Sequence, residues 1–272
     1  NNKQSLSIVT LITLLTALVG PSRVLAVPQA ATYMVNSNGN LGDDNVGDNI
    51  CRTSSGACTL RAAIQEANAH PGTTQTIAFA SQFQTPNQIT IPGCDLPAIT
   101  ADYTTIDASN QWDSGSDRPG VEINNLGCDA LLTINANGVT VMGLYFSGSA
   151  TTGVKVIGSG GGNTIGGSSA GQRNVFLTGK YGVHMTSTGA FNYVSSNYFG
   201  TIDGMSIPGW PYNGEVGVYV QGGDSYSVIS GNLIVGKSNV GILLSANRNL
   251  VSNNIVGLRD NRRAVLPNYN GV

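Results

Sequence analysis

Short apolar stretches with an alternating pattern recur along the chain from about residue 130. Five of them cover residues 132–134, 154–156, 183–185, 218–220 and 242–244. The last four directly follow Gly153, Gly182, Gly217 and Gly241, which lie 29, 35 and 24 residues apart. Apolar residues at every second position are typical of strands with one buried face. The pattern therefore predicts a series of short β-strands.

A second motif follows the later stretches and leads into another short apolar run. It occurs as Asn163-Thr164-Ile165, Asn192-Tyr193-Val194, Tyr226-Ser227-Val228 and Asn249-Leu250-Val251. Self-similarity over a few tens of residues indicates stacked units. Gly and Asn tolerate the left-handed backbone of tight turns between strands. Helical repeats do not contain so many Gly and Asn residues. Leucine-rich repeats are excluded because the pattern L-x-x-L-x-L is absent. We therefore predict an all-β solenoid, a parallel β-helix, with Val, Ile, Leu and Phe stacked inward and Asn stacked at the turns.

Loops of unequal length explain the unequal spacing of the repeats. Residues 200–216 are expected to be one such loop. The stretch 197–213 also resembles 254–270, which lies about 57 residues further along.

The first third of the chain has a different pattern, which predicts an amino-terminal cap. Residues 32–35 are expected to form a strand and 36–49 a polar loop. Residues 59–68 carry apolar side chains at 60, 63, 64 and 67, as in an amphipathic helix that begins with Thr59 as N-cap and ends before Pro71. Because a stacked sheet must protect its first open coil, we assign residues 27–80 to a cap and 81–272 to the coils.

The amino terminus has the pattern of a secretory signal peptide. Lys3 precedes the apolar residues 6–19, Gly20-Pro21 breaks the run, and small residues suit cleavage after Ala26 or Ala30. A buried core helix is the alternative. We expect residues 1–26 to be removed, the mature chain to be secreted or held at the cell surface, and no transmembrane span to remain. Since the sequence lacks an initiator Met and stops within a repeat, we also expect the natural chain to be longer.

The four cysteines agree with export, because disulfides persist in oxidising compartments. Three pairings are open, and Cys51–Cys58 with Cys94–Cys128 is favoured since both close locally. Zinc is the alternative, but there is no C-x-x-C pair and only His70 and His184 would assist.

The cap helix and the later repeats carry a resemblance. The sequence CTLRAAIQEANA at 58–69 resembles the CSLREAI-type amino-terminal domain of exported bacterial proteins, although Ala62 stands where that family commonly has Glu. Residues 163–179, 181–185, 192–204 and 226–232 are similar to right-handed parallel β-helix repeats. The resemblance implies the fold and its handedness. It leaves adhesin-like surface proteins, carbohydrate-binding proteins and polysaccharide lyases or hydrolases as functional classes.

Composition excludes several other classes. Charged residues make up 10% of the chain, against about a quarter in typical proteins, and 13 basic residues face 15 acidic ones. No basic surplus is available for nucleic-acid binding. With 36 Gly and 28 Asn among 272 residues, the composition argues against a helical bundle, and the 40% hydrophobic content excludes a charge-rich disordered tail.

The repeat register suggests one candidate catalytic site. If the flanking apolar residues point inward, Lys155, His184 and Tyr219 form an outward column between Thr133 and Leu243. β-Elimination on an acidic polysaccharide needs a base, a cation near the carboxylate and an acid for the leaving oxygen, which these three residues would supply. An ordinary mixed surface is the alternative. A glycoside hydrolase needs two close carboxylates, and the acidic residues of the repeats share no column.

Loop residues suggest a glycan-binding alternative. Arg259, Arg262 and Arg263 cluster in one loop, where they would contact an anionic glycan. Trp210 and Tyr212, together with Trp112 and Tyr269, would stack on sugar rings. For the arginines, the alternative is an ordinary solvated loop. For the aromatic residues, the alternative is that they pack the loops against the coils.

Two further motifs resemble a calcium loop and a phosphate-binding loop. Asp43, Asp44 and Asp48 have the composition of a calcium loop but not EF-hand spacing, so we expect a solvated cap loop, no metal and no cofactor. Residues 231–238 match G-x-x-x-x-G-K-S, but strands flank the motif and no helix follows, so we expect no nucleotide partner. A non-enzymatic surface or adhesin-like protein that presents loops to glycans is the favoured function, with a polysaccharide lyase as the alternative.

Overall fold

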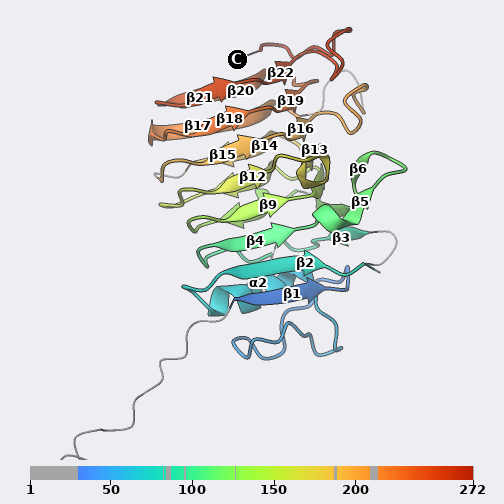
Figure 1. Ribbon diagram of the computed structural model, residues 1–272, viewed down its shortest axis with the longest axis vertical. Coiled ribbons are helices and arrows are strands. Elements are labelled where there is room, and N and C mark those ends of the chain that lie inside the picture. The colour runs from blue at the N-terminus through green and yellow to red at the C-terminus, as the bar shows by residue number, and fades with distance from the viewer. Residues whose placement is uncertain are drawn as a thin grey trace, which may run out of the picture.

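Three parallel β-sheets form the sides of a solenoid along the described chain (Figure 1). The computed structural model describes residues 30–271 except 82, 84–86, 95, 126, 187–188 and 209–213. The predicted signal peptide, residues 1–26, lies outside the described residues. None of the described helices is long and apolar enough to cross a membrane.

In the described part of the chain, sheet 1 has eight strands, and successive strands pair in parallel from one coil to the next. In order, they are β1 (Ala31–Val35), β2 (Gln75–Phe79), β4 (Thr104–Asp107), β9 (Thr140–Met142), β12 (Thr164–Gly166), β15 (Tyr193–Ser195), β18 (Val228–Ser230) and β21 (Leu250–Ser252).

The residues that the structure describes form seven strands in sheet 2 and five in sheet 3. Sheet 2 contains β3 (Gln88–Thr90), β7 (Val121–Asn125), β10 (Leu144–Gly148), β13 (Val175–Phe176), β16 (Tyr198–Phe199), β19 (Leu233–Ile234) and β22 (Ile255–Val256). Sheet 3 contains β8 (Ala130–Ile134), β11 (Thr152–Val156), β14 (Tyr181–Met185), β17 (Val216–Asp224) and β20 (Val240–Asn247). The predicted parallel β-helix is confirmed, and its coils begin well before residue 130.

The interior of the solenoid is filled by apolar side chains stacked coil on coil. The rings of Phe146, Phe176 and Phe199 are fully buried and nearly parallel, with centroids 4.9 and 4.7 Å apart. Equivalent positions of parallel strands repeat at the spacing of a sheet, which brings identical side chains into this stacked arrangement.

A buried asparagine ladder occupies one turn, as the sequence predicts. The side-chain amide of Asn174 donates to Oδ1 of Asn197 (3.1 Å), that of Asn197 to Asn232 (3.1 Å), and that of Asn232 to Asn254 (2.9 Å). Each backbone N–H also donates to the same acceptor oxygen. Buried polar groups need hydrogen-bond partners. The ladder supplies them through neutral amide groups, so the turn is stabilised without charged side chains.

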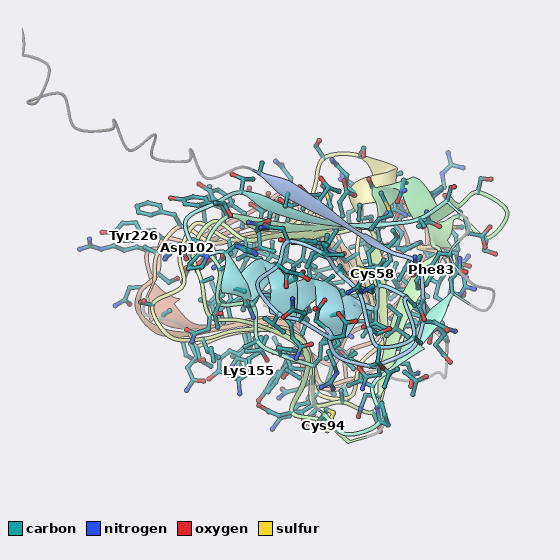
Figure 2. All side chains as sticks on the ribbon, turned by 90° about the horizontal axis from the view of Figure 1, so that it is seen from below. Cys58, Phe83, Cys94, Asp102, Lys155 and Tyr226 are labelled. Atoms are coloured by element: carbon teal, nitrogen blue, oxygen red, sulfur yellow. A yellow bond between two sulfur atoms is a disulfide. The ribbon has the colours of Figure 1, made fainter. Side chains whose placement is uncertain are left out.

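The cap helix α2 (Leu60–Ala69) lies across the end of the stack near β1 and β2 (Figure 2). Thr59 is its N-cap, because its side chain accepts a hydrogen bond from the N–H of Ala62 (3.0 Å). The favoured disulfides, Cys51–Cys58 and Cys94–Cys128, are both present. The boundary at residue 80 stays a prediction, although β1 and β2 already belong to sheet 1.

The alignment of Tyr226 with Asn192 is wrong by one residue. Val228 pairs with Tyr193, and Ile229 pairs with Val194. Tyr226 therefore corresponds to Phe191. Because side chains alternate between faces, a shift of one residue changes which side chains lie in one column.

Candidate functional site

The predicted column on sheet 3 is present. Lys155 pairs with Thr133 on one side and His184 on the other, and Tyr219 lies between His184 and Leu243. His184 and Tyr219 stack with ring centroids 4.7 Å apart and an interplanar angle of 7°. The geometry brings the three residues together, whereas their catalytic role stays a prediction.

The surroundings of this column restrict what it does chemically. Nζ of Lys155 forms an ion pair with Oδ2 of Asp129 at 2.6 Å, so the lysine charge is already balanced. Burial lowers the pKa of His184 below its usual value, while the hydrogen bond with Gln221 (3.2 Å) opposes that shift. A neutral imidazole accepts a proton, so His184 is suited to act as a base.

A hollow of about 590 Å³ opens beside sheet 2, next to the hairpin formed by β5 (Trp112–Asp113) and β6 (Arg118–Pro119). The hairpin projects from the coils (Figure 1). Its Trp112 and Arg118 form one part of the lining, and outward side chains of sheet 2 form another. The lining residues are Ser81, Asn87, Gln88, Asn110, Gln111, Trp112, Asp113, Arg118, Pro119, Gly120, Glu122 and Tyr145.

Parallel pairing of β3, β7 and β10 positions the sheet side of the hollow. Gln88, Glu122 and Tyr145 occupy equivalent outward positions in successive coils. Oε1 of Glu122 accepts a hydrogen bond from Nε2 of Gln88 (2.9 Å) and another from Oγ of Ser147. The carboxylate is therefore held in one orientation from two sides.

The charges in the hollow are mixed. Burial raises the pKa of Tyr145 to about 12, and the nearby carboxylate of Glu122 adds to that shift. A hydrogen bond from the Ser116 side chain lowers the pKa of Asp113. The guanidinium carbon of Arg118 lies 5.6 Å from the centroid of the Tyr145 ring. Among the described residues, the hollow thus combines two acidic side chains, one basic side chain and two aromatic rings.

Two buried polar atoms of the hollow lack partners among the described residues. Oδ1 of Asn87 is an acceptor without a donor, and Nε of Arg118 is a donor without an acceptor. Buried polar groups normally have a hydrogen-bond partner, so each such exception requires a physical reason. A ligand that both donates and accepts would satisfy the two atoms together.

A second hollow, of about 220 Å³, lies further along the same side. Arg173 and Tyr198 line it together with Asp260, whose Oδ2 accepts a hydrogen bond from the Tyr198 hydroxyl (2.8 Å). The guanidinium carbon of Arg173 lies 3.7 Å from the Tyr198 centroid and 5.5 Å from that of Trp112. Arg173 therefore connects the hairpin of the first hollow to the second.

The loop residues that the sequence predicts to bind a glycan do not form one site among the described residues. Trp210 and Tyr212 lie outside the described residues. Arg262 and Arg263 are exposed in a turn closed by an antiparallel bridge between Leu258 and Val265, and Arg259 is only partly exposed. None of these three arginines lines either hollow.

The carboxylates of the cap loop gather around the end of α2. Ligand atoms of Asp43, Asp48 and Glu66 lie within 4.8 Å of one another. Glu66 is fully buried, accepts hydrogen bonds from the N–H groups of Gly47 and Asn49, and its Oε1 lies within hydrogen-bond distance of Nε2 of His70, at 3.0 Å. These contacts hold the loop to the helix.

The segment with the phosphate-loop pattern has no phosphate-loop structure. β19 occupies its middle and β20 begins two residues after Ser238, so no helix follows Lys237 in this described segment. The Lys237 side chain is buried, with 1% of its surface exposed. A phosphate-binding loop requires a helix at this point.

Sequence reasoning missed most of the first hollow. Glu122 and Tyr145 come from strands before or outside the five apolar repeats, so they were not assigned to a column. The alternation of Val121, Ile123 and Asn125 with residues 122 and 124 is the signal that would have placed Glu122 outward. Trp112 was among the loop aromatics, but nothing in the sequence placed it against sheet 2.

Comparison with known families assigns the fold. A sequence profile described as "Right handed beta helix region" matches residues 129–265, half of the chain. The chain belongs to this right-handed β-helix family. Comparisons with the curated proteins and with the solved structures give no match. Membership agrees with the parallel sheets and fixes their right-handed winding, but it does not select a function.

Proposed function

We propose that this protein is an exported β-helix protein that binds a glycan in the hollow beside β5 and β6. One observation carries the proposal. Among the described residues, the hollow presents two aromatic rings together with a donor that has no partner there, Nε of Arg118, and an acceptor that has none, Oδ1 of Asn87. Ligand sites generally combine a concave apolar lining with a few polar groups that fix orientation.

A sugar matches this combination better than an anion or an apolar ligand. A hydroxyl group donates and accepts, so neighbouring hydroxyls would satisfy Arg118 and Asn87 together. The C–H face of a sugar ring would pack on the indole of Trp112 or the ring of Tyr145. Because the carboxylates of Asp113 and Glu122 offset the charge of Arg118, the hollow does not select strongly for an anionic ligand.

The two disulfides support the export part of the proposal. Both pairs are closed and the described residues contain no free cysteine. Disulfides persist in secreted and cell-surface proteins and are rare in reducing compartments. An exported solenoid that holds a glycan site on a rigid rod would act as a surface or adhesin-like protein.

A glycan array tests the proposal. The purified protein is expected to bind one class of oligosaccharide, and Trp112→Ala is expected to weaken that binding about tenfold because it removes the stacking surface. Tyr269→Ala is the matched control, since Tyr269 is 70% exposed and does not line the hollow. Unchanged thermal unfolding would show that the variants are folded. Equal affinity of Trp112→Ala and wild type, or no binding to any glycan, would contradict the proposal.

A polysaccharide lyase is the second candidate, supported by the column of Lys155, His184 and Tyr219. A neutral His184 stacked on Tyr219 provides a base, and Lys155 lies one coil away. Incubation with pectate and alginate, followed by ultraviolet absorbance of unsaturated products, tests this activity. The lyase proposal expects turnover that His184→Ala abolishes, and no turnover by the wild type would reject it.

A further inference from the structure

One corner of the coils has a left-handed backbone in coil after coil. Each residue at this corner lies one or two positions before the first residue of a strand of sheet 1. Their φ angles are +60° at Tyr103, +64° at Gly138, +67° at Gly162, +65° at Phe191, +47° at Tyr226 and +60° at Arg248. The N–H groups of the first four each donate to the carbonyl just before the next member, which shows that the positions are equivalent.

Large side chains are unusual on a left-handed backbone. A β-carbon crowds the backbone in the left-handed region, so glycine is the residue that adopts it without penalty. Gly138 and Gly162 follow that rule. Tyr103, Phe191, Tyr226 and Arg248 do not, and a bulky residue with positive φ is a true outlier. Glycine at these four positions would adopt the same backbone without this penalty.

The side chains at these positions are exposed rather than packed into the core. Phe191 is 56% exposed and Tyr226 is 36% exposed. Their ring centroids lie 5.4 Å apart with an interplanar angle of 25°. Nη1 of Arg248 donates to the Tyr226 hydroxyl, and its guanidinium carbon lies 5.3 Å from the Tyr226 centroid. Three successive coils thus present one continuous stack, which we call the aromatic corner.

The aromatic corner extends onto sheet 1 and lies far from the hollow. Tyr193 and Leu250, two residues after Phe191 and Arg248, are 39% and 56% exposed. Figure 2 shows Tyr226 at the outer edge of the coils, opposite the edge where Phe83 is labelled. In the coil before Phe191, residues 160–162 are glycines and have no side chains to cover its ring.

We propose that the aromatic corner binds the sugar rings of a neutral glycan by stacking, as a site separate from the hollow. Two strained, exposed aromatic rings that stack on each other in successive coils, at positions where the same fold also uses glycine, point to a function outside the fold. A protein partner fits less well, because a stable protein interface takes about 800 Å² from each partner. This strip is narrow, because it is one residue wide at the corner and extends onto sheet 1 through the exposed side chains of Tyr193 and Leu250.

Neutral oligosaccharides with glucan, galactan and mannan backbones are the probes. Phe191→Asn and Tyr226→Asn remove one ring each, and Asn tolerates the left-handed backbone. Each variant is expected to bind the preferred oligosaccharide about tenfold more weakly than the wild type. Its thermal midpoint is expected to be equal or higher, because the backbone strain is relieved. A side chain that merely supports the fold would lower the midpoint instead.

Two controls separate the aromatic corner from a general effect of the substitution and from the hollow. Tyr103→Asn makes the same change at the same φ, but Gly138 and Gly162 separate Tyr103 from the stack, so binding is expected to be unchanged. Trp112→Ala should leave binding at the corner intact, so that failure of one site is distinguishable from failure of the other. Unchanged affinity in both Phe191→Asn and Tyr226→Asn, or no oligosaccharide binding at all, would overturn the proposal. A dimer in sedimentation that Phe191→Asn converts to a monomer would also overturn it, since the corner would then be a protein interface.

Discussion

Single glycines in sheet 3 set how closely the coils stack. Gly153, Gly182, Gly217 and Gly241 each occupy the second position of a strand, and a β-carbon there would meet a core side chain and the carbonyl oxygen of the equivalent glycine or of Gly271 in the next coil. Their φ angles are not in the left-handed region, so space rather than backbone conformation requires glycine. For this reason a glycine precedes four of the apolar repeats.

Gly182→Ala is expected to destabilise the protein. Its β-carbon would lie 2.6 Å from a ring carbon of Phe199 and 2.7 Å from the oxygen of Gly217. Overpacking of this kind typically costs about 1–3 kcal/mol of unfolding free energy. Urea unfolding measures the change, with Gly223→Ala as the control because a β-carbon at Gly223 meets nothing within 4 Å. Equal stability of the two variants would refute a steric origin of the glycine spacing.

Lys237 makes stability depend on pH. Burial lowers its pKa to about 7, whereas a lysine in the unfolded chain titrates near about 10.4. Between these values the unfolded state binds more protons, so stability rises with pH, by about 2 kcal/mol from about pH 7 to about pH 9. Thermal unfolding across this range is the measurement, and Lys237→Met should remove the dependence. A wild-type midpoint that does not rise would show that Lys237 keeps its usual pKa.

At the scale of elements, the asparagine ladder holds one turn of successive coils together. Asn197 donates to the carbonyl of Ile165 and to Asn232, and accepts from the backbone and side chain of Asn174. Asn197→Ala would leave several of these buried groups unpaired, at about 1–3 kcal/mol for each group. We expect a loss of about 2–4 kcal/mol in urea unfolding. The exposed Asn239→Ala is the control, and a loss in Asn197→Ala no larger than in this control would argue against a stabilising ladder.

The two disulfides should differ in what they contribute. They close loops of 7 and 34 residues, for which chain entropy gives about 2.4 and about 3.8 kcal/mol. Replacing Cys94 and Cys128 together by Ser should therefore lower the thermal midpoint more than replacing Cys51 and Cys58. The reverse order would show that local packing in the cap, rather than loop closure, dominates.

At the scale of the whole molecule, repeated local signals made the fold predictable. Three signals independently indicate the same structure: the alternation of apolar and polar residues, Gly and Asn at the turns, and the spacing of the apolar stretches. The helix signal at Thr59 was local as well, because its N-cap hydrogen bond spans only three residues. The aromatic corner was hidden because Tyr226 was aligned one residue away from its true partner, Phe191.

The hollow depends on contacts that no local pattern encodes. Asn87, Trp112 and Tyr145 are far apart in the sequence and meet only because strands of successive coils pair and the β5–β6 hairpin lies beside them. The column of Lys155, His184 and Tyr219 was predictable because its spacing follows the repeats. Its chemistry was not, since Asp129 lies outside the motif and balances the lysine charge.

Binding at Arg118 is the most direct test of the proposed function. Isothermal titration of the oligosaccharide selected by the array should show binding to Arg118→Met about tenfold weaker than to wild type, because methionine has no donor at the position of Nε. Arg262→Met removes an equal charge from an exposed turn away from the hollow and should bind like the wild type. Equal affinities of Arg118→Met and wild type would contradict the claim that this hollow is the glycan site.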